Sequence, residues 1–594
     1  MAILDWGIVG GYLLLSLGVG LYFTRRASSS LDDYFVAGRS LPWWLAGTSI
    51  VATTFSSDTP LMVAGMVRDS GIYENWFWWS AAFGSLISVY FFSKLWKRSG
   101  VRTDIEFIAL RYEGKGAVYL RYFLALYKGI FFNMFILTSV TLAVGKLFGV
   151  ILHLSPEPLI TLPILGPITP SLALIVGLAT MTFFYTILSG LYGVVYTDLL
   201  QFVLAMVGAI SLAWLAWADA ASTGVSVVER LSASPGFRPE MLNFFPSFEN
   251  FDLKVLTFVV YLGVLWWGMA PGYAYQIQRL LACKTEKDAL LANLWYSVLH
   301  YAVRSWPWII VGVLSVIYFP DLVDSEKAYP MMIDKFMPVG LKGIMIASLL
   351  AAYMSTINTL LNWGSSYVIN DFIRPRNPEL TEKKAIFYGR VTGGLLAVLM
   401  LFFVTRLNSI LGIYKYVTLM ESGAAIILVL RWYWWRVNAW TEISALAASL
   451  IVANFLQLWS VTAPPLEGYD GMFPVRILIT TVAAAIVWIS VMIYTTTEPS
   501  AHVIEFYKKL RIGGNGWKRV FESLPDFQPY AHSFKNDVMA YFASLIVIFG
   551  FLYGVGQLLF GETWSGYIAL GVVFMSAVYL WKALDKITVS VDEH

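Results

Sequence analysis

The chain has 594 residues, of which 58% are hydrophobic and 13% are charged. This balance lies far outside the range of soluble domains, so the composition excludes a soluble globular protein of this size. The net charge of +3 reflects basic loops and gives no sign of a nucleic-acid partner. Cys283 is the single cysteine, which excludes an intramolecular disulfide, and the five histidines show no spacing typical of a metal-dependent enzyme.

Apolar runs long enough to cross about 30 Å of hydrocarbon as helices recur from one end of the chain to the other. We therefore expect an all-α integral membrane protein with about 15 spans in the lipid bilayer. The expected ranges are 3–23, 41–66, 75–93, 118–150, 169–189, 191–217, 255–276, 289–319, 339–368, 386–405, 408–431, 438–462, 474–496, 537–559 and 564–583.

The first apolar run predicts the orientation of the chain. No basic residue precedes it, whereas Arg25 and Arg26 follow it, so we expect a retained helix with its N-terminus outside and not a cleavable signal. The loops expected inside agree with this orientation because they are rich in Lys and Arg, including Arg111, Arg279 and Arg431. An odd number of spans then puts the C-terminus in the cytoplasm, and we expect a multi-pass protein of the plasma (cell inner) membrane.

The chain divides into five expected segments. Residues 1–40 hold an extra helix and a cytoplasmic loop, 41–217 a first repeat, 218–254 an extracellular connection, 255–431 a second repeat, and 432–594 about four extra helices. The last segment includes a cytoplasmic loop at about 497–535 with the basic amphipathic run HVIEFYKKLRIGGNGWKRV. This run either lies on the inner membrane surface or is a plain solvated loop.

The two repeats are expected to have opposite topology, because each contains five spans. The first helix of each repeat is interrupted, by TTFSSDTP at 53–60 and by WWGMAPGYAYQ at 266–276. Lipid does not tolerate the backbone groups that such breaks release, whereas a polar cavity between two helices uses them. The alternatives are a polar face that joins helices in the first case and a simple proline kink in the second.

A patch of oxygen atoms follows from the run IASLLAAYMSTINTLL. The carbonyl of Ala352 lies three and four residues before Ser355 and Thr356, so three oxygens converge on one side of a helix. The carbonyls of Ala52 and Phe55, freed at the first break, could complete a shell for Na⁺, which is a hard cation that prefers oxygen ligands. The alternative is that both hydroxyls bond back to their own helix.

Asp198, in SGLYGVVYTDLLQF, strengthens the prediction of a cation. A carboxylate within the membrane is costly unless it meets a cation, a proton or a hydrogen-bond donor. The alternative is an aspartate at the inner interface that bonds locally after Thr197.

At these residues the sequence resembles the sodium:solute symporter family, which includes sodium/glucose, sodium/proline and sodium/sialate cotransporters. The resemblance covers about residues 5–435 and rests on DYFVAGRSLPWWLAGTSIVAT, SGLYGVVYTDLLQ, IQRLLACKTEKDA, and AAYMSTINTLL followed by Asp371. It implies two inverted five-helix repeats, alternating access, and Na⁺ as the coupling ion. The sodium site it implies consists of Ala52, Phe55, Ala352, Ser355 and Thr356, and a second sodium in some members lies near the aspartate that matches Asp198.

The sequence departs from the sugar-transporting members where they bind their solute. Asp58 and Thr59 replace a Glu-Gln pair, Tyr273 and Ala274 replace an Asn-Gln pair, and Lys415 aligns approximately with a glutamine. A glucose-type pocket is therefore not reproduced. We expect instead an aromatic wall suited to stacking on a sugar ring or on a flat ligand. Its members are Trp76, Trp78, Trp79, Trp266, Trp267 and Tyr273.

Arg304 and Lys415 are cations within or beside apolar spans. They either bind a carboxylate of the solute or pair with internal acids such as Glu421, and internal pairing is slightly favoured.

The sequence thus predicts a secondary transporter, not an enzyme, that couples sodium to a small polar organic solute, with a sugar, acidic sugar or carboxylate favoured. No obligate protein partner is inferred. Proton coupling through Asp58 or Asp198, and a solute sensor with the same fold, are the alternatives.

Overall fold

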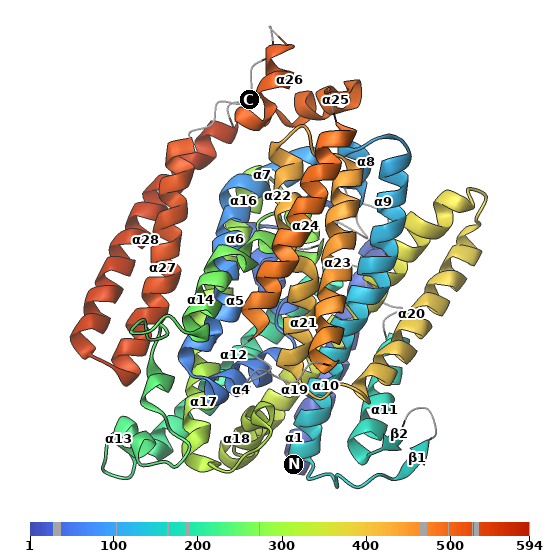
Figure 1. Cartoon of the computed structure of the whole chain (residues 1–594). Coiled ribbons are helices and arrows are strands. Elements are labelled where there is room, and N and C mark those ends of the chain that lie inside the picture. The colour runs from blue at the N-terminus through green and yellow to red at the C-terminus, as the bar shows by residue number, and fades with distance from the viewer. Residues whose placement is uncertain are drawn as a thin grey trace.

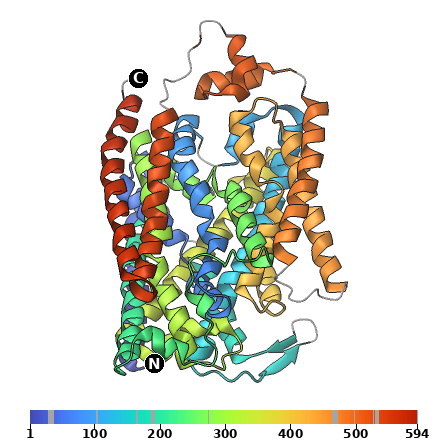
Figure 2. The same cartoon turned by 60° about the vertical axis from the view of Figure 1, so that its left-hand side comes forward.

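The computed structural model describes residues 1–27, 37–101, 104–162, 166–185, 191–272, 274–462, 472–496, 498–524, 527 and 534–592. Long helices run side by side in one bundle, and the N- and C-termini lie at its opposite ends (Figures 1 and 2). Termini at opposite ends agree with an odd number of spans, whereas the orientation itself stays a prediction.

The elements before the second broken helix, apart from single 3₁₀ or π turns, are the following. They are α1 (Ile3–Ala27), α3 (Trp43–Thr53), α4 (Asp58–Asp69), α5 (Trp76–Trp79), α6 (Ala81–Ile87), α7 (Ser93–Ser99), α8 (Glu106–Arg111), α9 (Gly114–Leu126), α10 (Asn133–Ile151), β1 (Ile160–Leu162), β2 (Gly166–Ile168), α11 (Pro170–Tyr185), α12 (Leu191–Ala221) and α13 (Val227–Ser232). The antiparallel pair β1–β2, in which Thr161 faces Pro167, is a small departure from the all-α expectation.

The elements of the second half are again helices. They are α14 (Leu253–Gly263), α15 (Ala274–Ala282), α16 (Glu286–Ser297), α17 (Ser305–Tyr318), α18 (Ala328–Phe336), α19 (Leu341–Tyr367), α20 (Glu382–Val404), α21 (Ile410–Ser422), α22 (Ala425–Tyr433), α23 (Ala439–Thr462), α24 (Phe473–Thr495), α25 (Ala501–Leu510), α26 (Lys518–Glu522), α27 (Phe534–Phe560) and α28 (Thr563–Asp592).

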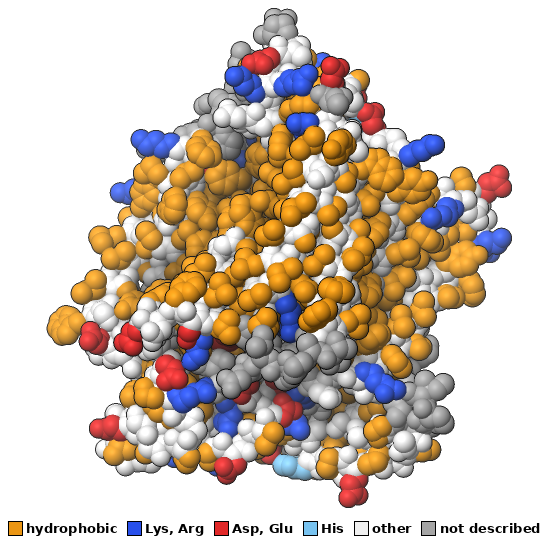
Figure 3. Space-filling model, in the orientation of Figure 1, with side chains coloured by type: hydrophobic (Ala, Val, Ile, Leu, Met, Phe, Trp, Pro, Cys, Tyr) orange, Lys and Arg blue, Asp and Glu red, His pale blue; other side chains and the backbone are white. Residues whose placement is uncertain are grey.

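Nine helices of the described residues are long and apolar enough to cross a membrane, or up to 11 if each of two bent pairs counts as one span. On the face drawn in Figure 3, hydrophobic side chains cover the middle of the molecule, and most charged side chains lie toward its two ends. The chain is therefore a multi-pass membrane protein. The expected total of about 15 spans is higher than this count and stays a prediction. The count does not test the inverted repeats, which also stay a prediction.

The first predicted helix break is confirmed. Helices α3 and α4 meet at 63° across residues 54–57. The backbone bonds of α3 end with Thr54 N donating to Ile50 O and Phe55 N donating to Ala52 O at 3.3 Å. Pro60, which lacks an N–H, lies in the first turn of α4, where that donor is not needed.

The second predicted break is also confirmed. Helix α14 ends at Gly263, a 3₁₀ turn covers Leu265–Met269, and α15 begins only at Ala274. Gly272 lies in this break with a φ of +90°, a conformation that favours glycine. The preceding Pro271 O accepts a hydrogen bond of 2.6 Å from Trp96 Nε1. Both breaks are thus built from residues that an uninterrupted helix would exclude.

A third break, which the sequence did not predict, separates α21 from α22 by 42°. Ser449 Oγ of α23 bridges the broken backbone, because it donates to Met420 O at 2.6 Å and accepts from Gly423 N at 3.1 Å. A Cβ atom on Gly423 would lie 2.5 Å from the Ala484 side chain. The close approach of α23 and α24 therefore requires glycine at this bend.

The amphipathic run after α24 packs on the protein, which corrects both expectations for it. Phe506 and Leu510 of α25 are buried, and Phe506 lies against Phe107 of α8. Arg111, expected in an exposed basic loop, is also buried and donates hydrogen bonds to the carbonyls of Arg431, Trp434, Trp435 and Val437. The apolar face of α25 is therefore occupied by protein and not by lipid.

Candidate functional site

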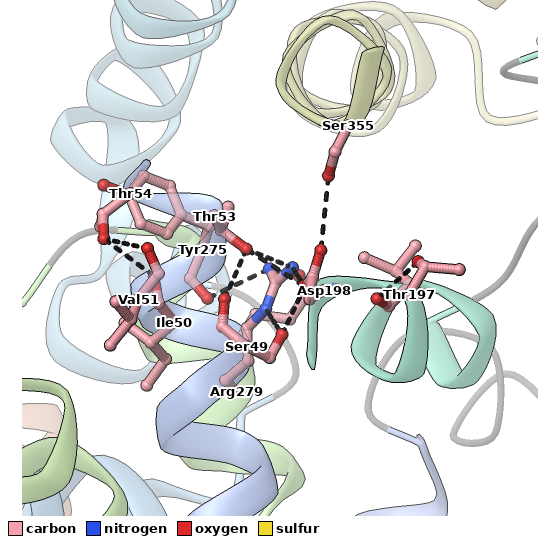
Figure 4. A network of polar contacts seen from close by, with 12 residues as sticks. Ser49, Ile50, Val51, Thr53, Thr54, Thr197, Asp198, Tyr275, Arg279 and Ser355 are labelled. Atoms are coloured by element: carbon pink, nitrogen blue, oxygen red, sulfur yellow. Dashed lines mark hydrogen bonds and ion pairs between the residues drawn. The ribbon is translucent and has the colours of Figure 1, made fainter. Parts of the chain in front are cut away.

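Asp198 of α12 is the centre of a buried polar cluster beside the first helix break (Figure 4). Its Oδ2 accepts hydrogen bonds from Ser49 Oγ at 2.6 Å and from Thr53 Oγ1 at 3.4 Å. Ser49 and Thr53 are four residues apart, so they share one face of α3. Asp198 therefore holds α12 against the end of α3, which excludes the expected alternative of a purely local bond after Thr197.

Arg279 of α15 forms the positive half of this cluster. Its Nη2 lies 3.7 Å from Asp198 Oδ2, and both side chains are 1% exposed. The same guanidinium donates to Ser49 Oγ at 3.3 Å and to Thr53 Oγ1 at 3.1 Å. The expectation that Arg279 lies in an inner loop is wrong, because α15 begins inside the bundle and places this side chain beside Asp198. Without Arg279 that carboxylate would be buried without a cation.

Ser355 and Thr356 of α19 lie on the other side of Asp198. Ser355 Oγ donates to Asp198 Oδ1 at 3.5 Å, as Figure 4 shows. Thr356 Oγ1 is buried and has no hydrogen-bond partner among the described residues. Neither hydroxyl bonds back to α19, unlike Thr138 and Thr141 of α10, which donate to the carbonyls four residues before them. A buried hydroxyl oxygen without a partner is a group that fits a cation ligand.

The carbonyl groups at the end of α3 divide into two sets. Arg304 Nη1 donates to Val51 O at 3.2 Å, and its Nη2 donates to Thr54 O at 3.4 Å. The carbonyls of Ala52 and Phe55 form the other set, which receives no hydrogen bond from a described side chain, and both residues are buried. Ala52 O accepts a backbone bond from Phe55 N at 3.3 Å, and its second lone pair can still meet a cation. The residues present therefore fit the expected Na⁺, since two break carbonyls, the Ala352 carbonyl and two hydroxyls are neutral oxygens.

Arg304 itself lies where α17 begins and is 1% exposed. Its guanidinium also bonds to His300 and lies 5.4 Å from the centre of the Trp308 ring. No described acidic side chain lies within ion-pair distance of it. The expected pairing of Arg304 with an internal acid is therefore wrong, because backbone carbonyls at the C-terminal end of α3 carry the partial negative charge that it meets.

Asp58 begins α4 and is 1% exposed. Its Oδ2 accepts from Ser139 Oγ of α10 at 2.8 Å and from Tyr414 OH of α21 at 2.7 Å, and its Oδ1 accepts from Thr59 Oγ1 at 3.4 Å. Asp58 thus joins the broken helix to α10 and α21.

Lys415 follows Tyr414 on α21 and has a different partner from the one expected. Its Nζ lies 3.5 Å from Glu74 Oε1, so the suggested pairing with Glu421 is wrong, although internal pairing of this lysine is confirmed.

The predicted aromatic wall is dispersed. Trp79 is fully buried and stacks on Phe244 at 5.2 Å, so its assignment to the wall is wrong in this conformation. Trp78 stacks on Tyr301 at 6.0 Å, whereas Trp267 stacks on Trp266 at 4.2 Å. Tyr273 lies outside the described residues. The large rings pack on their own neighbours because the bundle interior offers apolar surface on every side.

Sequence reasoning missed the roles of Ser49, Thr53, Arg279, Ser139 and Tyr414. A signal existed for the first three, because Ser49 and Thr53 are polar at helical spacing in an apolar run, and Arg279 follows directly on a predicted span. No local signal marks Ser139 or Tyr414, because their common partner Asp58 is distant in sequence.

Comparisons with known proteins agree with the family resemblance that the sequence motifs indicate. A family model described as the sodium:solute symporter family matches residues 34–451. A sodium/glucose cotransporter of Vibrio parahaemolyticus is 26% identical over an alignment 500 residues long, which covers 78% of this chain and 87% of the relative. The human sodium/myo-inositol cotransporter 2 is 26% identical over an alignment 500 residues long, which covers 75% of this chain and 69% of the relative.

One solved structure supports the fold. It is a substrate-bound, outward-open state of a Na⁺-coupled sialic acid symporter, with a TM-score of 0.63 and 19% identity. The match covers 84% of this chain and 100% of the other. The two proteins therefore share a transporter fold over almost the whole of the smaller chain.

Proposed function

The chain belongs to the sodium:solute symporter family, and we propose that it uses a sodium gradient to carry a small polar organic solute across the membrane by alternating access. The family and the relatives are transporters and not enzymes, and their sodium coupling supports Na⁺ as the coupling ion. One Na⁺ that moves down 100 mV and a tenfold gradient releases about 3.7 kcal/mol, enough to concentrate a neutral solute several-hundred-fold.

In this proposal Na⁺ binds between the end of α3 and the middle of α19. Its ligands are the carbonyls of Ala52, Phe55 and Ala352 and the hydroxyls of Ser355 and Thr356. The observation that carries the assignment is the buried Thr356 Oγ1 without a partner. A hydroxyl in this state is costly in the absence of an ion, because hydrogen-bonding capacity is left unused. Sodium binding supplies the missing interaction.

Asp198 is the candidate for a second sodium, with Ser355 between the two positions. Arg279 already provides a positive charge 3.7 Å from the carboxylate. A second Na⁺ would have to share that carboxylate with a guanidinium, so the proposal favours one sodium for each solute. The ratio of sodium to solute fluxes distinguishes the two stoichiometries.

The solute is proposed to bind beyond the first break, near Asp58, Thr59, Trp78 and Arg304. Asp58 offers a buried carboxylate, and Trp78 offers a partly buried indole beside His300 and Tyr301. A solute with several hydroxyl groups matches the hydroxyl-rich surroundings of Asp58, and a carboxylate on it matches Arg304. We therefore favour a sugar, acidic sugar or other carboxylate.

In the conformation described, the proposed path of the solute to Asp58 is closed between α4 and α21. Tyr414 is bonded to Asp58, and Lys415 is paired with Glu74. Alternating access then requires α21 to leave α4 when the solute enters from that side, and the bend at Gly423 allows it to move apart from α22.

The experiment is uptake by proteoliposomes of glucose, myo-inositol, glucuronate, N-acetylneuraminate and amino acids, each with and without an inward sodium gradient. Uptake of one solute driven by sodium is the expected result. Binding of a solute without movement across the membrane would favour a sensor instead.

Proton coupling is the second candidate, and Asp58 is the observation that favours it. Its carboxyl accepts hydrogen bonds from three hydroxyl groups and from a backbone amide, and none of the described Lys, Arg or His side chains lies within ion-pair distance of it. A buried carboxyl without a cation is a place for a proton. Uptake that persists without sodium and collapses when the pH gradient is dissipated would establish this alternative.

A further inference from the structure

A cleft lies outside the barrier formed by Tyr414 and Asp58. Its walls come from the residue that caps α4, the 3₁₀ turn that follows it, the start of α5, most of α14 and the middle of α21. The lining residues are Ser70, Tyr73, Glu74, Trp76, Leu253, Lys254, Thr257, Phe258, Tyr261 and Lys415. The cleft therefore touches the segment that follows α4, the first part of the second broken helix, and the helix that carries Tyr414.

The cleft combines charge with aromatic surface. Two lysines and one glutamate line it, so its charged side chains favour an anionic group. Lys415 Nζ lies 3.5 Å from Glu74 Oε1, and Tyr261 OH donates to the same oxygen at 3.3 Å. The side chains of Lys415 and Glu74 are only 12% and 13% exposed, so solvent screens this pair less than a surface pair. A carboxylate that enters the cleft competes with Glu74 for Lys415.

The aromatic residues supply a different contact. Tyr73, Trp76, Phe258 and Tyr261 are four of the ten lining residues. Trp76 and Tyr261 are buried, and the Trp76 ring is stacked on Phe245 and Phe549. The aromatic surface left for the apolar C–H face of a sugar ring therefore comes from the half-buried Tyr73 and Phe258, with the ammonium of Lys254 at the edge of the cleft. A ring with a carboxylate matches both parts of the lining better than a neutral ring or a simple anion does.

The cleft is connected to the barrier through adjacent residues. Tyr414 bonds to Asp58 across the path, and its neighbour Lys415 faces Glu74 in the cleft. Both contacts hold the same turn of α21 against the segment that follows the first break. Loss of the contact between Lys415 and Glu74 removes one of the polar contacts that hold this turn of α21, while the bond between Tyr414 and Asp58 is kept.

We infer that this cleft is a second, external binding site for carboxylate-bearing sugars, which the solute occupies before the barrier opens. The inference rests on the proposed function for the identity of the cargo class, but the binding site itself can be tested without transport. A bound carboxylate takes Lys415 from Glu74 and so weakens the hold of α21 on the outer half of the broken helix.

The test is equilibrium binding of radiolabelled glucuronate to the purified full-length chain in saturating sodium. Lys415→Met removes the cation and weakens binding at the cleft about tenfold or more, the loss expected for a charge-assisted hydrogen bond. Glu74→Gln removes the competitor of the carboxylate, keeps an acceptor for Tyr261, and tightens binding several-fold. A purely structural role of the pair would weaken binding in both variants, and that result would overturn the inference.

A second pair of variants tests how many glucuronate molecules each chain binds. Thr257→Trp fills the cleft, whereas Val259→Trp places the same indole on the same helix at a position that is 49% exposed and outside the lining. We expect Thr257→Trp to bind one glucuronate per chain fewer than the wild type, and Val259→Trp to match the wild type. Equal stoichiometry in all three proteins refutes the external site. If the variants differ in stoichiometry as expected but the wild type does not transport glucuronate, the proposed cargo class is refuted and the external site is retained.

Discussion

Thr356→Val separates the proposed role of the Thr356 hydroxyl as a sodium ligand from any structural role. The substitution keeps the shape of the side chain and replaces its hydroxyl by a methyl group. Thr356 is 8% exposed, and its Oγ1 has no partner among the described residues. The hydroxyl therefore contributes no hydrogen bond to the fold without sodium, and its removal breaks none.

Two effects of opposite sign follow. An unsatisfied buried hydroxyl costs about 1–3 kcal/mol, so the valine variant should match or exceed the wild type in its free energy of unfolding without sodium. The sodium complex, in contrast, loses one ligand oxygen. If that oxygen contributes a comparable 1–3 kcal/mol, the sodium concentration for half-maximal uptake rises roughly 5- to 150-fold.

The assays are thermal unfolding without sodium and the sodium dependence of uptake in proteoliposomes. Thr138→Val is the matched control, because Thr138 is also buried but donates to Met134 O at 2.8 Å. The control should lose stability and keep its sodium dependence. A Thr356→Val protein that is less stable without sodium, or that needs no more sodium than the wild type, would contradict the assignment.

Three further substitutions test the groups around the break. Arg304→Lys replaces a guanidinium that donates to two carbonyls by a single ammonium group. It should raise the half-saturating sodium concentration roughly five- to thirtyfold in the same uptake assay. An unchanged concentration would exclude a role of Arg304 in positioning the break. Arg279→Gln leaves Asp198 buried without its cation and should lower the free energy of unfolding by about 3–5 kcal/mol, and Asp198→Asn in the same chain should restore most of it; a double variant as unstable as the single one would argue against the pair. Arg111→Ala should lower the melting temperature, because several backbone carbonyls lose their donor, while sodium dependence stays unchanged; a shift in sodium dependence would mean that the contact of α8 with the loop after α22 reaches the transport site.

The helix breaks could be predicted from the sequence where their cause is local. Gly272 and the prolines at 60 and 271 are exceptions in apolar runs, and each has a backbone reason to end a helix. The bend at Gly423 has no such signal, since its reason is Ser449 of another helix and the space left by Ala484. A single sequence does not contain the position of that neighbour.

The candidate site divides in the same way. The spacing of Ala352, Ser355 and Thr356 follows from helix geometry alone, so their common face could be predicted. The partners of the charged groups could not be predicted, because an arginine bonds to whichever oxygen the packing of the helices places near it. Arg304 meets backbone carbonyls and Lys415 meets Glu74, although the sequence offers several other carboxylates.

The end of α3 is the element that joins these contacts, because each of its sides meets a different helix. The side chains of Ser49 and Thr53 bind Asp198 of α12, and the carbonyls of Val51 and Thr54 bind Arg304 before α17. In the proposed function the remaining carbonyls bind sodium together with α19. A helix end of this kind has a fixed supply of free carbonyl groups, so the guanidinium and the ion divide that supply between them. In the proposed function, sodium binding then ties the end of α3 to α19. Because Ser355 is both a proposed ligand and a donor to Asp198, this change also affects α12 and α15. Under this proposal, coupling of ion to solute requires no long pathway, since the break assigned to the ion is continuous with Asp58 at the start of α4.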